Sequence, residues 1–323
     1  MNVLILSAAA KVLLVESFQA ALRDRGGKVL AGDIEPDSAA LHIADEGVLL
    51  PRSQETGFIP ALKRLCRERE IALVVPTRDA ELPILAPWRN EFAAAGTTIL
   101  VASPETIALC QDKRRFTAFC AREGFPIART YGADEEPLRF PVFVRPATGA
   151  GGAGARRIDS AAGWHALGAG RAELVIQDFV EADEYTVDTL MDLEGNPLQA
   201  VARRRLLVRG GEAQKSRVED VPALAQLALN VAARLRLVGH NVIQCFRDRA
   251  GALSLIEINP RFGGASNLSI VAGLDSPCRL VALVAGDRSA LARRPIRYGL
   301  GMLRYSRDVI VEPGDMARLA EAG

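Results

Sequence analysis

The residues with the clearest chemical potential lie in one short stretch late in the chain, Leu255–Arg261, with the sequence LIEINPR. Successive side chains of a strand point to opposite faces, so Glu257, Asn259 and Arg261 would project together while the isoleucines between them pack into a core. Gln244, on the preceding apolar stretch, can stand beside them. Carboxylate and amide oxygens suit Mg²⁺, and a guanidinium can grip a phosphoryl group. The stretch therefore predicts a metal and phosphate site, and a merely structural strand is the alternative.

A glycine-rich loop between two predicted strands is the second candidate. The first strand covers 140–145 and ends on Arg145, the second covers 156–158, and the loop carries Gly149, Gly151, Gly152 and Gly154. A P-loop would instead lead into a helix and carry Lys-Ser/Thr. The N–H groups of a glycine-rich hairpin can cover phosphates, with Arg145 beside them. A flexible surface turn is the alternative.

Two lysines stand out because the chain has so few. Lys and Arg together number 40, and only five of these residues are Lys. Lys113 lies upstream of the glycine-rich loop in the run QDKRRF, where a solvated helix face is the alternative interpretation. Lys215 lies in a glycine-containing segment, 210–216. In a chain that uses Arg almost everywhere, a retained Lys favours a specific role, and survival by chance is the alternative.

The stretch 174–188 predicts an adenine slot, because an apolar strand is followed by a short exposed segment and a new strand that starts at Glu184. Gln177 or Glu184 could hold the ribose hydroxyls. Backbone groups between the two strands could recognise the edge of the base, at Asp178, Phe179 and Val180.

The elements that would position these residues fall into two kinds. In the first hundred residues, apolar runs at 2–6, 28–33, 47–50, 71–75 and 98–101 alternate with helical stretches at 12–22, 57–69 and 79–95. Such alternation predicts an open parallel sheet of Rossmann-like outline. No G-x-G-x-x-G follows the first strand, which argues against dinucleotide binding. Ligands of such sheets bind at the carboxyl ends of the strands. Those ends carry Ser7–Lys11, Asp33–Glu35 and Pro76–Glu81.

From residue 103 onward the pattern becomes mixed α+β. Ser103-Pro104 and Asp112 each predict a helix start. Hairpins are predicted over 184–193 with 197–208 and over 241–247 with 252–258, and helices over 221–236 and from 266 onward. These changes predict three domains, at 1–108, 109–175 and 176–323.

Composition excludes several classes of function. The 323 residues carry a formal net charge of +1, which argues against nucleic-acid or membrane binding through bulk charge. RNA binding through Arg203–Arg205 also lacks an aromatic platform, so these arginines either face the site or are solvated. No apolar run is long enough to cross a membrane, and NVLIL at the start predicts a strand and not a signal peptide. Five scattered cysteines predict reduced thiols in a cytoplasmic protein.

Together these motifs resemble the ATP-grasp superfamily. The most similar members are carboxylate–amine ligases related to the carbamoyl phosphate synthetase large chain and to the ligase of pyrrolysine biosynthesis. The resemblance implies an α/β N-terminal Rossmann-like (pre-ATP-grasp) domain followed by an α+β ATP-grasp fold. It also implies ATP and two Mg²⁺ ions as cofactors, with Mn²⁺ as a substitute. Homodimerisation is implied by analogy alone.

The resemblance also implies roles for particular residues. Gln244, Glu257 and Asn259 match the metal ligands, while Arg261, Lys215 and Arg145 match catalytic positions. The remaining matches are nucleotide contacts, at Lys113, Gly149, Gly151, Gly152, Gly154, Gln177, Asp178, Phe179, Val180 and Glu184. Two departures are Gln177 where relatives have a ribose-binding Glu, and Ala8–Lys11 in place of a glycine- and arginine-rich turn.

The expected activity is ATP-dependent amide formation through an acyl phosphate, with small-molecule carboxylate and amine substrates such as amino acids. Two alternatives stay open: phosphorylation of bicarbonate or carbamate, and an ATP-binding subunit without turnover. The glycine-rich loop and the segment 206–216 are the candidates for a lid that excludes water.

Overall fold

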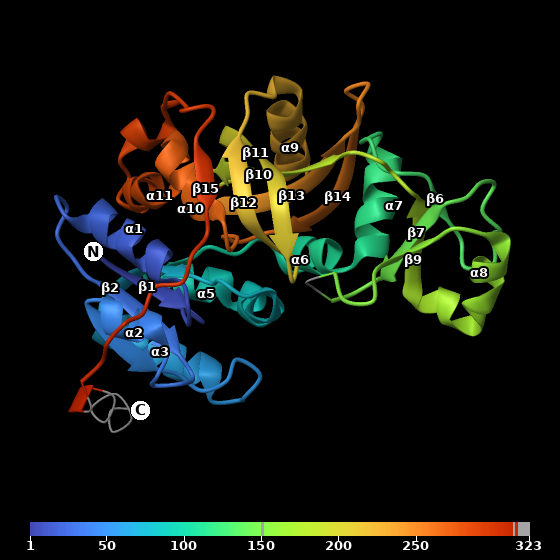
Figure 1. The fold of residues 1–323 in the computed structure, drawn as a ribbon. Coiled ribbons are helices and arrows are strands. Elements are labelled where there is room, and N and C mark those ends of the chain that lie inside the picture. Colours follow the sequence, from blue (N-terminus) through green and yellow to red (C-terminus); the bar gives the residue numbers. More distant parts are fainter. Residues whose placement is uncertain (150–151, 313, 316–323) are drawn as a thin grey trace.

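The computed structural model describes residues 1–149, 152–312 and 314–315. Figure 1 shows an N-terminal helix-and-sheet domain, a central antiparallel sheet with helices packed against it, and a small lobe that projects at the far end. The predicted succession of a parallel α/β domain and a mixed α+β region is confirmed.

The N-terminal domain is a five-stranded parallel sheet of order β3-β2-β1-β4-β5. Its strands are β1 (Asn2–Leu6), β2 (Val29–Asp33), β3 (Glu46–Leu49), β4 (Ile71–Val75) and β5 (Thr98–Ile99). Its first helices are α1 (Val12–Leu22), α2 (Ala39–Ile43) and α3 (Phe58–Glu68). Residues 3 and 5 of β1 pack with α1, whereas residues 4 and 6 pack with α3. Both faces of the sheet are therefore covered, which explains the unbroken apolar runs.

The stretch expected as one helix over 79–95 is four short pieces. They are η1 (Asp79–Glu81), α4 (Leu82–Leu85), η2 (Ala86–Trp88) and α5 (Arg89–Ala94). Pro83 and Pro87 lie in the first turns of α4 and η2. A proline inside a helix removes a backbone donor and clashes with the preceding turn, so each one begins a new piece instead.

Two capped helices join the domains at the predicted positions. In α6 (Pro104–Gln111), the Ser103 side chain accepts a hydrogen bond from the amide of Thr106. In α7 (Lys113–Glu123), Asp112 accepts from the amides of Arg114 and Arg115. These side chains satisfy amides that have no partner within the helix. The boundary expected at residue 108 falls inside α6.

The small lobe is an antiparallel sheet of order β6-β9-β7-β8 with one helix packed on it. Its elements are β6 (Thr130–Tyr131), β7 (Val142–Pro146), β8 (Arg156–Ile158), α8 (Ala161–Ala166), η3 (Gly168–Glu173) and β9 (Leu174–Asp178). The glycine-rich loop joins β7 to β8, as predicted. The boundary expected at residue 175 falls inside β9, which pairs with β7 along its whole length.

The central sheet has six antiparallel strands in the order β14-β13-β10-β11-β12-β15. The strands are β10 (Asp183–Met191), β11 (Pro197–Arg209), β12 (Glu212–Val218), β13 (His240–Arg247), β14 (Leu253–Asn259) and β15 (Gly301–Leu303). Both predicted hairpins are confirmed. The proposed lid segment 206–216 is instead mostly regular strand, in the hairpin of β11 and β12.

Helices pack on both sides of this sheet. They are α9 (Pro222–Arg234), α10 (Ser266–Ser269), the π-helical turn η4 (Ile270–Leu274), α11 (Ser276–Val284) and η5 (Arg288–Leu291). One face of the sheet is apolar, where Tyr185 and Ile243 share a core with residues of α9. The helices after β14 pack instead against α1, with the rings of Phe18 and Phe262 6.0 Å apart. The N-terminal domain and the central sheet thus share a core.

The described residues include no single helix that is long and apolar enough to cross a membrane. The stretches Ser266–Leu274 and Ser276–Val284 meet that test only as a pair, bent by 73°. Four of the five cysteines are buried and Cys278 is half-buried, and all five are free thiols as expected.

Candidate active site

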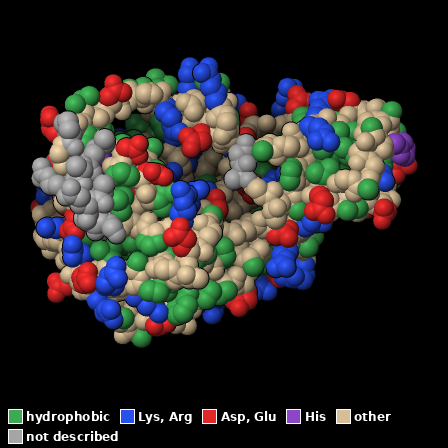
Figure 2. All heavy atoms as spheres, turned by 90° about the horizontal axis from the view of Figure 1, so that it is seen from below, with side chains coloured by type: hydrophobic (Ala, Val, Ile, Leu, Met, Phe, Trp, Pro, Cys, Tyr) green, Lys and Arg blue, Asp and Glu red, His purple; other side chains and the backbone are tan. Residues whose placement is uncertain are grey.

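A cavity of about 740 Å³ lies where the N-terminal domain, the small lobe and the central sheet meet. Figure 2 shows the hollow between the small lobe and the rest of the molecule. The cavity brings together six of the residues singled out in the sequence: Lys113, Gly149, Gln244, Glu257, Asn259 and Arg261.

The floor of the cavity is a row of side chains that crosses four strands of the central sheet. Arg203 on β11 is opposite Thr186 on β10, Thr186 is opposite Gln244 on β13, and Gln244 is opposite Glu257 on β14. Directly opposed residues of antiparallel strands point to the same face. All four line the cavity, while the other face of the sheet is apolar. Sheet register therefore brings residues of four different strands into one row.

Glu257 has two neighbours that limit where a cation could bind it. The Nζ of Lys113 lies 4.0 Å from its Oε2 and donates to the carbonyl of Gly149 at 2.7 Å. Burial, offset in part by Glu257, lowers the pKa of Lys113. With its amide turned to satisfy both neighbours, Gln244 donates to Oε1 of Glu257 at 3.2 Å and accepts from Arg205 at 3.3 Å. Lys113 thus links the glycine-rich loop to the predicted metal ligand.

The strand that carries Glu257 contains a β-bulge at Ile256. The register passes from Gln244 opposite Glu257 to Cys245 opposite Leu255, which leaves Ile256 unpaired. Ile258 is in the core as expected, but Ile256 is only half-buried. The freed carbonyl of Ile256 accepts a hydrogen bond from Arg145 at 2.9 Å.

Arg145 and Gln177, which were expected at the phosphates and the ribose, are buried and bonded to each other. Nη2 of Arg145 donates to Oε1 of Gln177 at 3.2 Å, and Gln177 donates in turn to Thr130 at 3.1 Å. Neither is among the described residues that line the cavity. The pair ties the small lobe to the bulge in β14, and the Nε of Arg145 is buried with no partner in the described part of the chain.

Arg261 is held by an aspartate from the N-terminal domain. Its Nε and Nη2 donate to the two carboxylate oxygens of Asp79, at 2.9 and 2.5 Å. Its Nη1 donates to the carbonyl of Phe262 at 2.9 Å. A bidentate pair of this kind fixes the plane of the guanidinium. The orientation of Arg261 therefore depends on how the N-terminal domain packs on the central sheet.

Glu184, expected at the ribose, forms an ion pair with Arg205 of β11. Burial raises the pKa of Glu184, and the charge of Arg205 partly offsets this. Arg205 also donates to the carbonyl of Gly211 at 2.7 Å and lines the cavity, whereas Glu184 is not among its described lining residues. Glu184 therefore positions Arg205 here.

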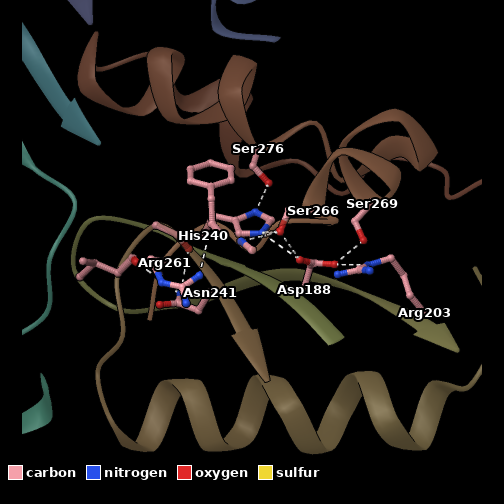
Figure 3. A network of polar contacts seen from close by, with 12 residues as sticks. Asp188, Arg203, His240, Asn241, Arg261, Ser266, Ser269 and Ser276 are labelled. Atoms are coloured by element: carbon pink, nitrogen blue, oxygen red, sulfur yellow. Dashed lines mark hydrogen bonds and ion pairs between the residues drawn. The ribbon is translucent and has the colours of Figure 1, made fainter. Parts of the chain in front are cut away.

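A buried polar network lies behind Arg203, as Figure 3 shows. Asp188 is fully buried and accepts from Arg203 Nε at 2.5 Å. Its other hydrogen bonds come from Ser266 at 2.7 Å, Ser269 at 2.5 Å and the ring of His240 at 3.0 Å. Although burial raises the pKa of Asp188, Arg203 and His240 together hold it well below its usual range. Nη1 of Arg203 is buried and has no hydrogen-bonding partner among the described residues, and Arg203 lines the cavity.

Replacing Asp188 with alanine should lower the free energy of unfolding by about 3–5 kcal/mol, because it leaves the Arg203 guanidinium buried without a counterion. Chemical denaturation measures the effect. Asp183→Ala is the matched control. Asp183 also lies on β10 and pairs with an arginine of β11, Arg204, at 2.5 Å, but this ion pair is exposed to solvent. It should cost less than about 1 kcal/mol. Equal losses in the two variants would contradict a stabilising role for the network.

Several predicted nucleotide contacts are not brought to the cavity. Gly152 and Gly154 lie in the turn before β8 with φ of 73° each, and Gly151 lies outside the described residues.

The segment expected to recognise the base is partly occupied by bonds within the small lobe. The carboxylate of Asp178 accepts hydrogen bonds from Tyr131 and Arg139, at 2.6 Å each. The amide of Phe179 donates to Pro141, which leaves Val180 as the open backbone donor of this segment among the described bonds.

Lys215 differs from its expected place as well. It lies within β12, is exposed, and has no side-chain partner among the described residues. The glycines expected to form a loop around it, Gly210 and Gly211, make the tight turn before β12 and line the cavity themselves. A regular strand after that turn carries Lys215 away from the cavity, so its catalytic role remains a prediction.

The cavity also contains residues to which the sequence analysis gave no individual role. Lys11, Arg78 and Asp79 belong to the strand ends Ser7–Lys11 and Pro76–Glu81 of the N-terminal domain, and Arg304 comes from the segment after β15. Strand-end position marked the first three as ligand contacts, but only domain packing brings them to this cavity, and no local signal marks Arg304. Thr186 and Arg203 could have been found from the alternation of polar and apolar residues along β10 and β11. Arg204 faces away from the cavity and pairs with Asp183.

The cavity is strongly basic. Among its described lining residues are seven cations and three carboxylates: Lys11, Arg78, Lys113, Arg203, Arg205, Arg261 and Arg304, with Asp79, Glu212 and Glu257. Burial and the charge of Arg261 lower the pKa of Lys11. An excess of cations in a recessed site favours a polyanionic ligand such as a triphosphate.

The donor set fits Mg²⁺ bound together with phosphates. Glu257 contributes one carboxylate, and Oδ1 of Asn259 meets only a long 3.5 Å contact from Arg261. The described residues contain no group of three or more His, Cys, Asp or Glu side chains able to hold a metal alone. Mg²⁺ is commonly held by one or two carboxylates, with phosphate oxygens and waters completing its coordination. The amide oxygen of Gln244 faces Arg205, so Gln244 would have to turn to become a ligand.

Two family models match separate parts of the chain. Residues 3–100 match the PylC-like N-terminal domain. Residues 171–305 match the family described as ATP-grasp in the biosynthetic pathway with Ter operon. The carbamoyl phosphate synthase large chain of Deinococcus radiodurans is 33% identical over 121 residues. That match spans 32% of this chain and only 12% of the Deinococcus protein.

Solved structures with the same fold span nearly the whole chain. The biotin carboxylase domain of Hydrogenobacter thermophilus 2-oxoglutarate carboxylase, in complex with MgADP, ADP and bicarbonate, has a TM-score of 0.71 at 18% identity and covers 93% of this chain and 73% of that one. The ADP complex of purK, N5-carboxyaminoimidazole ribonucleotide synthetase, has a TM-score of 0.71 at 14% identity, with coverage of 93% and 80%. From its motifs, its cavity and these matches, the chain is an ATP-grasp protein with a PylC-like N-terminal domain, distantly similar to the carbamoyl phosphate synthase large chain.

Proposed function

We propose that this protein is an ATP-dependent carboxylate–amine ligase that acts through an acyl phosphate and releases ADP and phosphate. The observation that carries the proposal is the cavity in which Glu257, Asn259 and Arg261 lie beside Lys113. Glu257 and Asn259 provide oxygen donors for a metal ion, and Arg261 and Lys113 provide cations for a triphosphate, in the same cavity. The MgADP complex of a biotin carboxylase domain with the same fold supports nucleotide binding as a use of this fold.

The proposed reaction has two displacement steps. A carboxylate oxygen of the first substrate attacks the γ-phosphorus of ATP, the bond to the bridging oxygen breaks, and ADP leaves. The amine nitrogen of the second substrate then attacks the acyl carbon, the bond to the phosphate oxygen breaks, and phosphate leaves as the nitrogen loses a proton. Catalysis of such transfers consists mainly of positioning and charge stabilisation.

The chain's own residues supply both effects. Arg261, fixed by Asp79, would stabilise the charge that develops on the transferring phosphoryl group. Lys113 would hold the glycine-rich loop against the phosphates. Glu257 and Asn259 would hold Mg²⁺, which when bound would neutralise charge on the phosphate oxygens. Small-molecule carboxylates and amines are the partners in this proposal, and the cytoplasm is the compartment.

An ADP-release screen over pairs of carboxylates and amines, with bicarbonate and ammonia as separate arms, tests the proposal. With an active carboxylate labelled with ¹⁸O, the released phosphate should gain one ¹⁸O atom, because the carboxylate oxygen that attacks phosphorus stays with it. Hydroxylamine in place of the amine should yield a hydroxamate. Release of ADP with unlabelled phosphate would contradict the acyl phosphate, and activity with bicarbonate alone would favour the carbamate alternative.

A further inference from the structure

Lys11 is a cation of the cavity that has no role in the two steps of the proposed reaction. It lines the cavity and is half-buried, and its Nζ has no hydrogen-bonding or ion-pair partner among the described residues. Lys113, the other lysine among the described lining residues, already donates to the carbonyl of Gly149 and lies 4.0 Å from Glu257. Lys11 is therefore the lysine of this lining that is free to act on a ligand.

The presence of a lysine at this position has a chemical consequence. Lys and Arg together number 40 in the chain, and only five of them are Lys. An arginine keeps its proton at physiological pH, whereas a lysine can lose it where burial or nearby cations disfavour the ammonium form. A group needed only for its positive charge could be Arg, as most cations of this cavity are. The lysine at position 11 therefore favours a role in which the side chain accepts and releases a proton.

Four charged groups interact with Lys11, and they form two closed pairs. Asp79 of η1 accepts both of its hydrogen bonds from Arg261, at 2.9 and 2.5 Å, and Glu212 of β12 pairs with Arg304. Each carboxylate is thus neutralised by an arginine, and neither is a dedicated counterion for Lys11. Burial and the charge of Arg261 lower the pKa of Lys11 and Arg304 adds to this, while Glu212 and Asp79 partly offset the shift.

The backbone before Lys11 is held in a strained turn. Ser7 and Ala9 have φ of 45° and 30°, in a left-handed region that residues other than glycine rarely adopt. The amide of Ala9 donates to Asp33 at 2.5 Å, and the amide of Lys11 donates to the carbonyl of Ala8 at 2.6 Å. Strain of this kind persists only where the surrounding structure enforces it, and it is common at active sites. Here it fixes the point from which the side chain of Lys11 enters the cavity.

We propose that Lys11 is the general base that removes a proton from the amine substrate. This assignment rests on the proposed ligase function, in which the acyl phosphate forms beside Arg261, and Lys11 lies close enough to Arg261 for their charges to interact. At neutral pH an amine is mostly an ammonium ion, which has no lone pair with which to attack carbon. A base near the reacting nitrogen is therefore needed before the second step can begin.

The proton transfers balance in the following way. Neutral Nζ of Lys11 takes one proton from the ammonium ion, and the freed lone pair of the nitrogen forms the bond to the acyl carbon. The bond from the acyl carbon to the phosphate oxygen breaks, and the departing phosphate takes the second proton from the nitrogen. Lys11 then passes its own proton to water after the products leave.

Lys11→Arg tests the proposal, because it keeps the positive charge and cannot accept a proton. With a carboxylate found by the ADP-release screen, amide formation from an amine at neutral pH should fall by at least about 10²-fold, the lower range for a general base. Hydroxylamine is largely unprotonated at neutral pH and needs no base, so hydroxamate formation should stay within about three-fold of the wild type. Lys28→Arg, the same change at an exposed position, should alter neither rate.

Two further readouts separate a base from a structural residue. An acyl phosphate that meets no free amine hydrolyses, so Lys11→Arg should release more ADP for each amide formed. Raising the pH should reduce the deficit of the variant, because more of the amine then loses its proton without help. Lys11→Met, which also lacks a proton acceptor, should behave in the same way and serves if the arginine variant does not fold.

A titration of the lysines gives a measurement that needs no substrate. Reductive methylation with ¹³C-formaldehyde labels the lysine side chains for NMR, and their small number allows each signal to be assigned from a variant. The signal that disappears in Lys11→Arg should titrate at lower pH than the signal that disappears in Lys28→Arg. Titration of the two signals at the same pH would contradict a neutral Lys11.

The outcomes separate this inference from the ligase proposal. Amide formation at the wild-type rate in Lys11→Arg and Lys11→Met would overturn the role as base and leave the ligase proposal standing. An equal loss with the amine and with hydroxylamine would also overturn it, because both acceptors would then need the same contact. If the wild type releases no ADP with any pair of substrates, the ligase proposal is wrong and the role of Lys11 falls with it.

Discussion

Arg261→Ala should lower the kcat of ATP-dependent turnover by about 10³-fold, the lower end of the effect of an arginine that stabilises a phosphoryl-transfer transition state. The dissociation constant of ATP should change much less, because the cavity keeps its other cations. Steady-state kinetics and nucleotide titration measure the two quantities separately. Arg64→Ala, an exposed arginine of α3, is the control.

The link between Arg261 and Asp79 gives this prediction a second test. Asp79→Asn keeps the guanidinium but weakens the bidentate pair that fixes its plane. We expect it to lower kcat by about ten-fold, since a catalytic group is then present but poorly positioned. If Arg261→Ala weakens ATP binding and leaves kcat unchanged, Arg261 binds the nucleotide and has no part in the transfer step.

Glu257→Ala and Asn259→Ala should each reduce Mg²⁺-dependent ADP formation by at least about 10²–10³-fold, the loss that removal of one electrostatic contact to a transition state typically produces. Both variants should fold, because Glu257 is 28% exposed and lies on the polar face of the sheet. A thermal melt with and without MgATP gives a second readout, since a bound ligand stabilises the folded state. The wild type should gain stability and Glu257→Ala should gain little.

Glu194→Gln is the control for this pair, because Glu194 is exposed in the turn between β10 and β11, far from the row that holds Glu257. It should retain full activity. Turnover at the wild-type rate in both Glu257→Ala and Asn259→Ala would overturn the assignment of the metal ligands. This conclusion would not depend on the kcat measured for Arg261→Ala.

Local sequence patterns predicted most of the elements correctly. The apolar runs of the parallel sheet, the caps of α6 and α7, and both hairpins occur where expected. The errors also have local causes that were present in the sequence. Pro83 and Pro87 divide the stretch 79–95, and β12 was mistaken for a loop because two glycines precede it.

The residues of the candidate site also fall into two groups: those placed by local strand geometry and those placed by contacts between distant segments. Residues two apart on one strand, such as Glu257 and Asn259, share a face by strand geometry alone, and both line the cavity. Arg145 and Gln177 were assigned to the nucleotide by position in a motif, but in the structure they bond to each other and to the carbonyl freed by the bulge at Ile256. A bulge depends on the register between two strands, which neither strand's sequence specifies.

The sequence by itself determined which residues of β14 and of the glycine-rich loop could act together, because short-range backbone geometry places residues at such spacings on one face or in one turn. Tertiary structure decided which other groups meet there. Asp79 and Lys11 reach Arg261 only because α1 and the helices after β14 bury a common core. Asp188 and Arg203 are buried together only because the last helices cover that end of the sheet. The energy of such contacts depends on burial and on domain packing, and these arise between segments that are remote in the chain.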